Sequence, residues 1–95
     1  MSTVRVSVII KGRVQGVYFR YETRQQALAL GVKGWVKNRP DGAVEGVFEG
    51  DRECVKKLVE WCRQGPPDAE VTELQAKWEE LRSNRCDFSC FRIEF

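Results

Sequence analysis

Apolar side chains alternate with polar ones at the start of the chain. Val4, Val6, Val8 and Ile10 occupy every second position, and the residues between the three valines are polar. A period of two is typical of a strand that buries one of its faces. The chain is therefore predicted to begin with a strand over residues 4–10.

Two later segments have the features of helices. Residues 20–30 contain no glycine or proline, and Gly31 stands where a helix C-cap is expected. Asp51 is a suitable N-cap for a second helix, which the Gly65-Pro66-Pro67 sequence must end. Apolar side chains recur in this second segment at i, i+3, i+4 and i+7, and they belong to Val55, Leu58, Val59 and Cys62.

The remaining segments favour strands, with one ambiguity. Residues 32–37 and 43–49 are β-prone and flank a stretch of turn formers, which predicts a hairpin. The tail over residues 91–95 alternates again. Residues 70–81 fit a helical stripe and a strand alternation equally well, and periodicity alone does not decide between them. If 70–79 is a strand, the order is βαββαβ plus a short final strand, an α+β fold in which two helices cover one face of an antiparallel sheet. We expect Trp35 and Trp78 to lie in its core and strand pairs.

Length and charge restrict the class of protein. Ninety-five residues correspond to one domain, so residues 1–95 are expected to form a single unit. A formal net charge of +2 lacks the basic excess of a nucleic-acid or membrane-surface protein. No apolar stretch approaches the roughly 20 residues that span a bilayer, and no signal peptide is evident. We therefore expect a cytoplasmic protein.

The inventory of reactive side chains excludes several chemistries. Histidine is absent, which removes the commonest general base and metal ligand. Cys54, Cys62, Cys86 and Cys90 form no Cys-x-x-Cys pair, and the carboxylates are scattered, so no metal site is predicted. The cysteines are expected to be thiols in a reducing compartment, although a bridge from Cys54 or Cys62 to Cys86 or Cys90 is geometrically allowed.

A glycine-punctuated loop joins the first strand to the first helix. It reads Gly12-Arg13-Val14-Gln15-Gly16-Val17-Tyr18-Phe19-Arg20, hereafter the 12–20 loop. Glycine allows successive N–H groups to point into one concavity, the following helix adds unpaired N-terminal donors, and the arginine fork matches phosphate geometry. The loop therefore predicts a phosphate site. Its donors would be the Arg20 side chain and the backbone amides of Gln15, Gly16, Val17, Tyr18, Phe19 and Arg20.

Two other kinds of phosphate site are excluded by what the loop lacks. A thiol phosphatase places a cysteine six residues before its arginine, and that position is Val14. A nucleotide-binding loop of the Gly-x-x-x-x-Gly-Lys-Ser/Thr type requires a Lys-Ser/Thr pair, which the sequence lacks. A glycine turn by itself is more often a simple connection, so the loop needs a second signature.

A second segment supplies that signature. It reads Gly34-Trp35-Val36-Lys37-Asn38-Arg39-Pro40-Asp41-Gly42. Together the two segments resemble the signatures of the acylphosphatase family, at the family's separation, and the resemblance extends over nearly the whole chain. It implies a ferredoxin-like βαββαβ sandwich, in which residues 70–79 are a strand. It also implies hydrolysis of the carboxyl–phosphate bond of acyl phosphates without metal or cofactor. By this resemblance Arg20 and the loop amides bind the phosphate and Asn38 positions the attacking water.

The expected partners follow from the same resemblance. The substrate is a small-molecule acyl phosphate, inorganic phosphate is a product, and a monomer that binds no nucleic acid and no membrane is expected. The same element order occurs in RNA-recognition modules, but residues 44–49 are acidic and lack the Gly-aromatic signature of those modules. The alternative function is an acylphosphatase-like module that binds an acyl or carbamoyl phosphate within a larger maturation assembly. A chain that ends at Phe95 favours the free-standing enzyme.

Overall fold

The predicted order of elements is confirmed by the computed structural model, which describes residues 3–81 and 88–94. Each predicted segment forms the expected element, with bounds that differ by a few residues, and Phe95 of the predicted tail lies outside the described residues. The elements are β1 (Thr3–Arg13), α1 (Phe19–Leu30), β2 (Lys33–Asn38), β3 (Val44–Asp51), α2 (Arg52–Gln64), β4 (Glu70–Leu81) and β5 (Phe91–Glu94).

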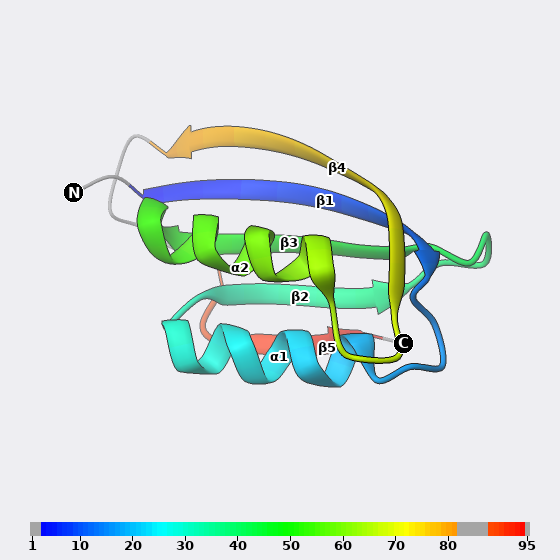
Figure 1. Ribbon diagram of the computed structural model, residues 1–95. Helices are drawn as coiled ribbons and strands as arrows, with labels where there is room; N and C mark the ends of the chain where they lie inside the picture. Colours follow the sequence, from blue (N-terminus) through cyan, green and yellow to red (C-terminus); the bar gives the residue numbers. More distant parts are fainter. Residues whose placement is uncertain (1–2, 82–87, 95) are drawn as a thin grey trace.

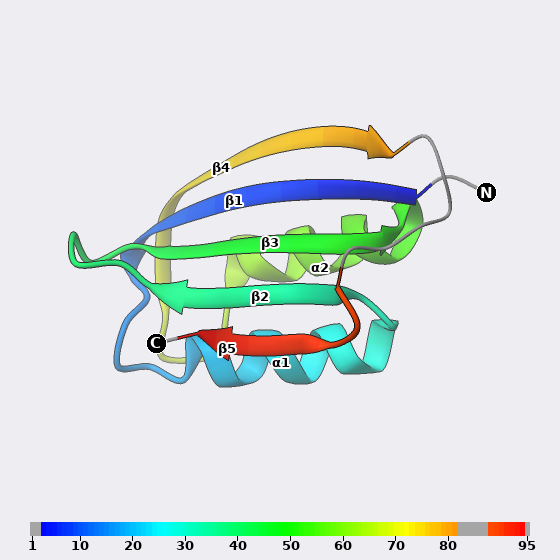
Figure 2. The same ribbon diagram turned by 180° about the vertical axis from the view of Figure 1, so that it is seen from behind.

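The strands form one sheet in the order β4-β1-β3-β2-β5, and both helices cover the same face of it (Figures 1 and 2). The four longer strands pair antiparallel, as predicted. The short extra strand β5 pairs parallel with β2, so the sheet is mixed, and only the direction of this strand departs from the predicted antiparallel sheet. The reason is topological. β4 runs antiparallel to β2, so it stops at the end of the sheet where β2 starts. A strand that starts at that same end beside β2 must run in the direction of β2.

The ambiguous segment is a strand. β4 pairs with β1 along its whole length, from Leu81 opposite Thr3 to Glu70 opposite Arg13. Because β4 is an edge strand, most of its side chains remain exposed. Trp78 pairs with Val6 of β1, as expected, but 43% of its surface is exposed, so the expectation that it lies in the core is wrong.

The core lies between the sheet and the helices, and it holds the 12–20 loop at both ends. The alternating apolar residues of β1 are buried, as are the four predicted apolar residues of α2. At the far end of the loop, Phe19 is buried and its ring centroid lies 5.7 Å from that of Trp61 on α2. Val14, at the near end, is also buried. The loop is therefore anchored on each side by a core side chain.

Gly34, in the second signature, is required by the close approach of two strands. Its φ is +139°, and a Cβ atom built there would lie 1.9 Å from the carbonyl oxygen of Val47 on β3. We expect Gly34→Ala to lower the free energy of unfolding by roughly 3 kcal/mol or more, because strain at positive φ adds to overpacking. Urea unfolding measures the change.

Gly31→Ala is the matched control. Gly31 forms the predicted C-cap of α1 with φ +71°, and nothing lies within 4 Å of the position its Cβ would take. The free energy of unfolding of this variant should therefore fall only by the cost of placing alanine at positive φ. Equal losses for the two variants would show that the approach of Gly34 to Val47 has no energetic importance.

Candidate active site

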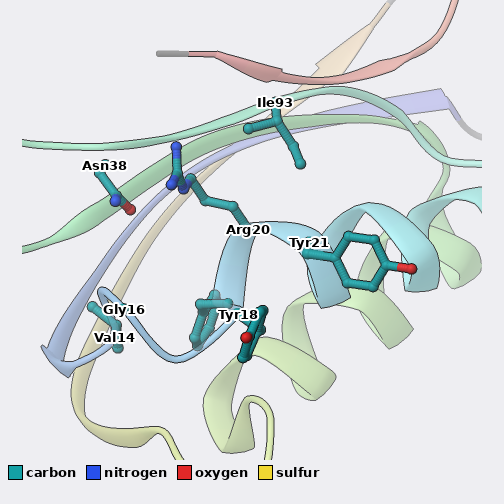
Figure 3. Close-up of a pocket in the computed structure, with 8 residues that line it drawn as sticks. Val14, Gly16, Tyr18, Arg20, Tyr21, Asn38 and Ile93 are labelled. Atoms are coloured by element: carbon teal, nitrogen blue, oxygen red, sulfur yellow. The ribbon is translucent and has the colours of Figure 1, made fainter.

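Three elements and the 12–20 loop surround one pocket of about 390 Å³ at the end of the sheet where β1 leads into α1 (Figure 3). The lining comes from the 12–20 loop, from the first turn of α1, from the last residue of β2 and from β5. Arg20 and Asn38, which are 18 positions apart in the sequence, both contribute to it. The lining residues are Val14, Gly16, Tyr18, Phe19, Arg20, Tyr21, Asn38 and Ile93.

The backbone of the loop has the alternation expected of an anion site. Gly16 has φ +75° and Tyr18 has φ +65°, whereas Val17 between them is not in the positive-φ region. Such an alternation turns consecutive N–H groups toward one side, where they can surround an anion. For tyrosine this conformation is strained, at a cost of about 1–3 kcal/mol, and strained residues of this kind concentrate at ligand sites.

The start of α1 adds further donors to the loop. Tyr18 occupies the N-cap position and makes no side-chain capping bond to the helix. The first N–H groups of a helix have no partner within the helix, and they favour an anion near them. The pocket is therefore placed where a phosphate group would be favourable.

Arg20 extends from this first turn into the pocket. Its side chain is half-buried and points toward Asn38, with Ile93 on the other side of it (Figure 3). The turn that carries it is fixed by the buried Thr23, whose Oγ1 donates to the carbonyl oxygen of Phe19 at 2.7 Å. A rigid turn limits the positions that the guanidinium can reach, which favours a defined geometry with a bound anion.

Asn38 is the last residue of β2 and pairs with Val44 of β3. Its Oδ1 atom is buried, and it accepts no hydrogen bond from the described part of the chain. A buried acceptor without a partner costs free energy, so such atoms in native proteins call for an explanation, and a functional one is common. Because Asn38 also lines the pocket, it is the candidate for a hydrogen-bond acceptor there.

Most of the predicted site residues meet in this pocket. Gly16, Tyr18, Phe19, Arg20 and Asn38 line it, whereas Gln15 and Val17 belong to the same loop without lining the pocket. Sequence reasoning missed three residues that also line it, namely Val14, Tyr21 and Ile93. The place of Ile93 depends on the parallel pairing of β5, in which Ile93 lies opposite Val36, and the sequence gives no signal for that pairing.

Other candidate groups lie outside the pocket. Burial raises the pKa of the Cys62 thiol to about 12, so this cysteine stays protonated at neutral pH and is a poor nucleophile. Within residues 3–81 and 88–94, no three potential metal ligands form a cluster. Neither helix in these ranges is long and apolar enough to cross a membrane.

Comparison with known proteins identifies the family of the chain. A model of the acylphosphatase family matches residues 6–91, a range that includes both signature segments. The acylphosphatase of Pelotomaculum thermopropionicum is 61% identical over 95 residues, which cover 100% of each chain. The crystal structure of acylphosphatase from Bacillus subtilis superimposes with a TM-score of 0.88 at 36% identity, over 97% of this chain and 99% of that chain.

A more distant structure shares the fold alone. Full-length HypF in its phosphate- and nucleotide-bound form superimposes with a TM-score of 0.78 at 22% identity, over 100% of this chain and 12% of that chain. The family model, in contrast, matches residues 6–91, and the Pelotomaculum relative is 61% identical over the full length of both chains. On this evidence the chain belongs to the acylphosphatase family.

Proposed function

We infer that the protein hydrolyses the carboxyl–phosphate bond of acyl phosphates to a carboxylate and inorganic phosphate. One observation supports this more than any other. The Arg20 fork, the positive-φ loop at Gly16 and Tyr18, and the buried Asn38 oxygen converge on one pocket. These are the groups that a phosphoryl transfer to water requires, namely a holder for the phosphoryl group and a holder for the nucleophile.

The leaving group explains why so few side chains suffice. A carboxylate departs from a mixed anhydride without needing a proton, so no strong general acid is required. In our proposal the phosphoryl oxygens bind the loop amides and the Arg20 guanidinium. Arg20 also offsets negative charge as the bond to the leaving group loosens. A chain without histidine can therefore bind the phosphoryl group and offset its charge.

The water is assigned to Asn38. Its Oδ1 atom accepts a hydrogen bond from the water and orients a lone pair toward phosphorus, in line with the departing carboxylate. An amide is not a base, so the proton of the water passes to a phosphoryl oxygen of the substrate itself. The new P–O bond then forms as the bond to the acyl oxygen breaks, and the products are a carboxylate and inorganic phosphate.

Turnover of a simple acyl phosphate by the purified chain tests this function. Acetyl phosphate should be hydrolysed at a rate that a strong chelator does not change, and inorganic phosphate should inhibit competitively because product and substrate share the recognised group. A rate that chelator abolishes and Mg²⁺ restores would contradict the mechanism. Binding of acetyl phosphate without turnover would instead indicate the alternative, a binding module of a larger assembly.

We also propose that residues 1–95 form a single domain and that the protein is a cytoplasmic monomer. We further propose that it binds no nucleic acid. Cys54, Cys62 and Cys90 are free thiols, which agrees with a reducing compartment, whereas Cys86 lies outside the described residues. The sheet face away from the helices carries opposite charges side by side, including the ion pair between Arg5 and Glu49, rather than a basic patch.

A further inference from the structure

The side chain of Gln15 links the 12–20 loop to the turn between β2 and β3. Its Nε2 atom donates to the carbonyl oxygen of Arg39 at 2.7 Å and to that of Ala43 at 2.9 Å. A primary amide has two N–H groups, so both donors of Gln15 are used. The side chain is half-buried, which strengthens these bonds relative to exposed ones.

The two acceptors are the ends of the turn that follows Asn38. Arg39 donates its backbone N–H to the carbonyl oxygen of Ala43 at 2.8 Å, and Gly42 donates to that of Arg39 at 3.1 Å. The carboxylate of Asp41 accepts from the backbone N–H of Ala43 at 3.0 Å. The turn is thus a hydrogen-bonded unit, and Gln15 holds it at the residue that directly follows Asn38.

The topology shows why such a link matters. The 12–20 loop continues β1, and Asn38 ends β2, but these strands are not neighbours because β3 lies between them. Their relative position would otherwise be transmitted through β3. In-line attack requires the phosphoryl group and the water to be held in a defined relative geometry, and an error of about 1 Å can cost on the order of 10²-fold in rate.

We propose that Gln15 is a positioning residue that fixes Asn38 relative to the phosphate-binding loop. This proposal rests on the function proposed above. It gives Gln15 a role through its side chain, in addition to the backbone role predicted from the sequence. A purely structural role in the turn is the competing explanation. A positioning role lowers kcat and leaves the inhibition constant of inorganic phosphate unchanged, whereas a general disturbance of the fold changes both constants.

The test uses Gln15→Met and Gln15→Ala, which remove both donors, the first at nearly constant length. We expect kcat for acetyl phosphate to fall roughly 10- to 10²-fold. The inhibition constant of inorganic phosphate should stay within about twofold, because the backbone amides and Arg20 remain. Thermal unfolding identifies the temperature range in which each variant is folded, and the kinetics are measured there.

The decisive arm repeats both substitutions in an Asn38→Ala background. If Gln15 acts through Asn38, its loss should then reduce kcat by no more than about twofold further. An equal loss in both backgrounds would overturn the proposal, and so would a parallel loss of phosphate affinity or an unchanged kcat. If instead Asn38→Ala alone retained the full rate, the role assigned to Asn38 in the proposed function would be the part that fails.

Gln75→Met is the matched control. Gln75 lies on β4, is exposed, and donates its Nε2 hydrogen bond to Glu73 on the same strand. The same change of side chain away from the pocket should leave kcat and phosphate inhibition within about twofold of the native values. A loss there comparable to that at Gln15 would show that the effect is a general one on the fold.

Discussion

Replacing Arg20 by lysine should weaken phosphate binding and lower kcat together. Lysine keeps the positive charge but lacks the planar fork that can engage two phosphoryl oxygens at once. Loss of one charge-assisted hydrogen bond costs about 1.5–3 kcal/mol, which corresponds to roughly 10- to 10²-fold in kcat/KM. Competitive inhibition by inorganic phosphate and the kinetics of acetyl phosphate hydrolysis measure the two effects.

Arg13→Lys is the control for this prediction. Arg13 belongs to the same loop, but its side chain is exposed at the end of β1 and it does not line the pocket. The same change of cation should therefore leave both constants nearly native. If Arg20→Lys also retained native phosphate affinity and rate, Arg20 would contribute only to a diffuse positive field, and the bidentate role would be wrong.

Local patterns were sufficient for most of the fold. The alternation in β1 and the i, i+3, i+4, i+7 spacing in α2 reflect burial against one neighbour, so each could be recognised within its own segment. The same reasoning could not decide residues 70–81, because an edge strand buries little and its side-chain pattern is weak. It also could not give the direction of β5 or the exposure of Trp78, since both depend on the position of a strand in the sheet.

In the site, too, features of a single segment were predicted, whereas features that depend on contacts between distant segments were not. Arg20 and Asn38 were predicted from signature segments, and the structure brings them to one pocket. The positive φ of Tyr18 could not be predicted from the sequence, because tyrosine rarely adopts that conformation. The bonds of Gln15 to Arg39 and Ala43 join residues 24 and 28 positions apart, beyond the range of any local pattern.

Replacing Asn38 by alanine should separate catalysis from binding. The proposed mechanism has Arg20 hold the phosphate while Asn38 holds only the water, so the inhibition constant of phosphate should remain near native. An interaction that acts mainly in the transition state lowers kcat when it is lost. By analogy with the loss of one preorganised oxyanion donor, kcat should fall on the order of 10²-fold or more, about 2.7 kcal/mol or above.

Asn38→Asp distinguishes a water-positioning amide from a general base. Aspartate keeps the shape of the side chain and an acceptor oxygen, but it brings a negative charge to an anionic substrate and removes the N–H donor. Its position at the end of β2 is partly buried, so the charge is screened less than at an exposed site, and repulsion of the phosphoryl group should be correspondingly stronger. We therefore expect this variant to lose kcat as well, and to bind phosphate less tightly than Asn38→Ala. A rate equal to or above the native one, rising with pH as the carboxylate ionises, would instead show that this position can act as a base, and the water-positioning role of Asn38 would have to be abandoned.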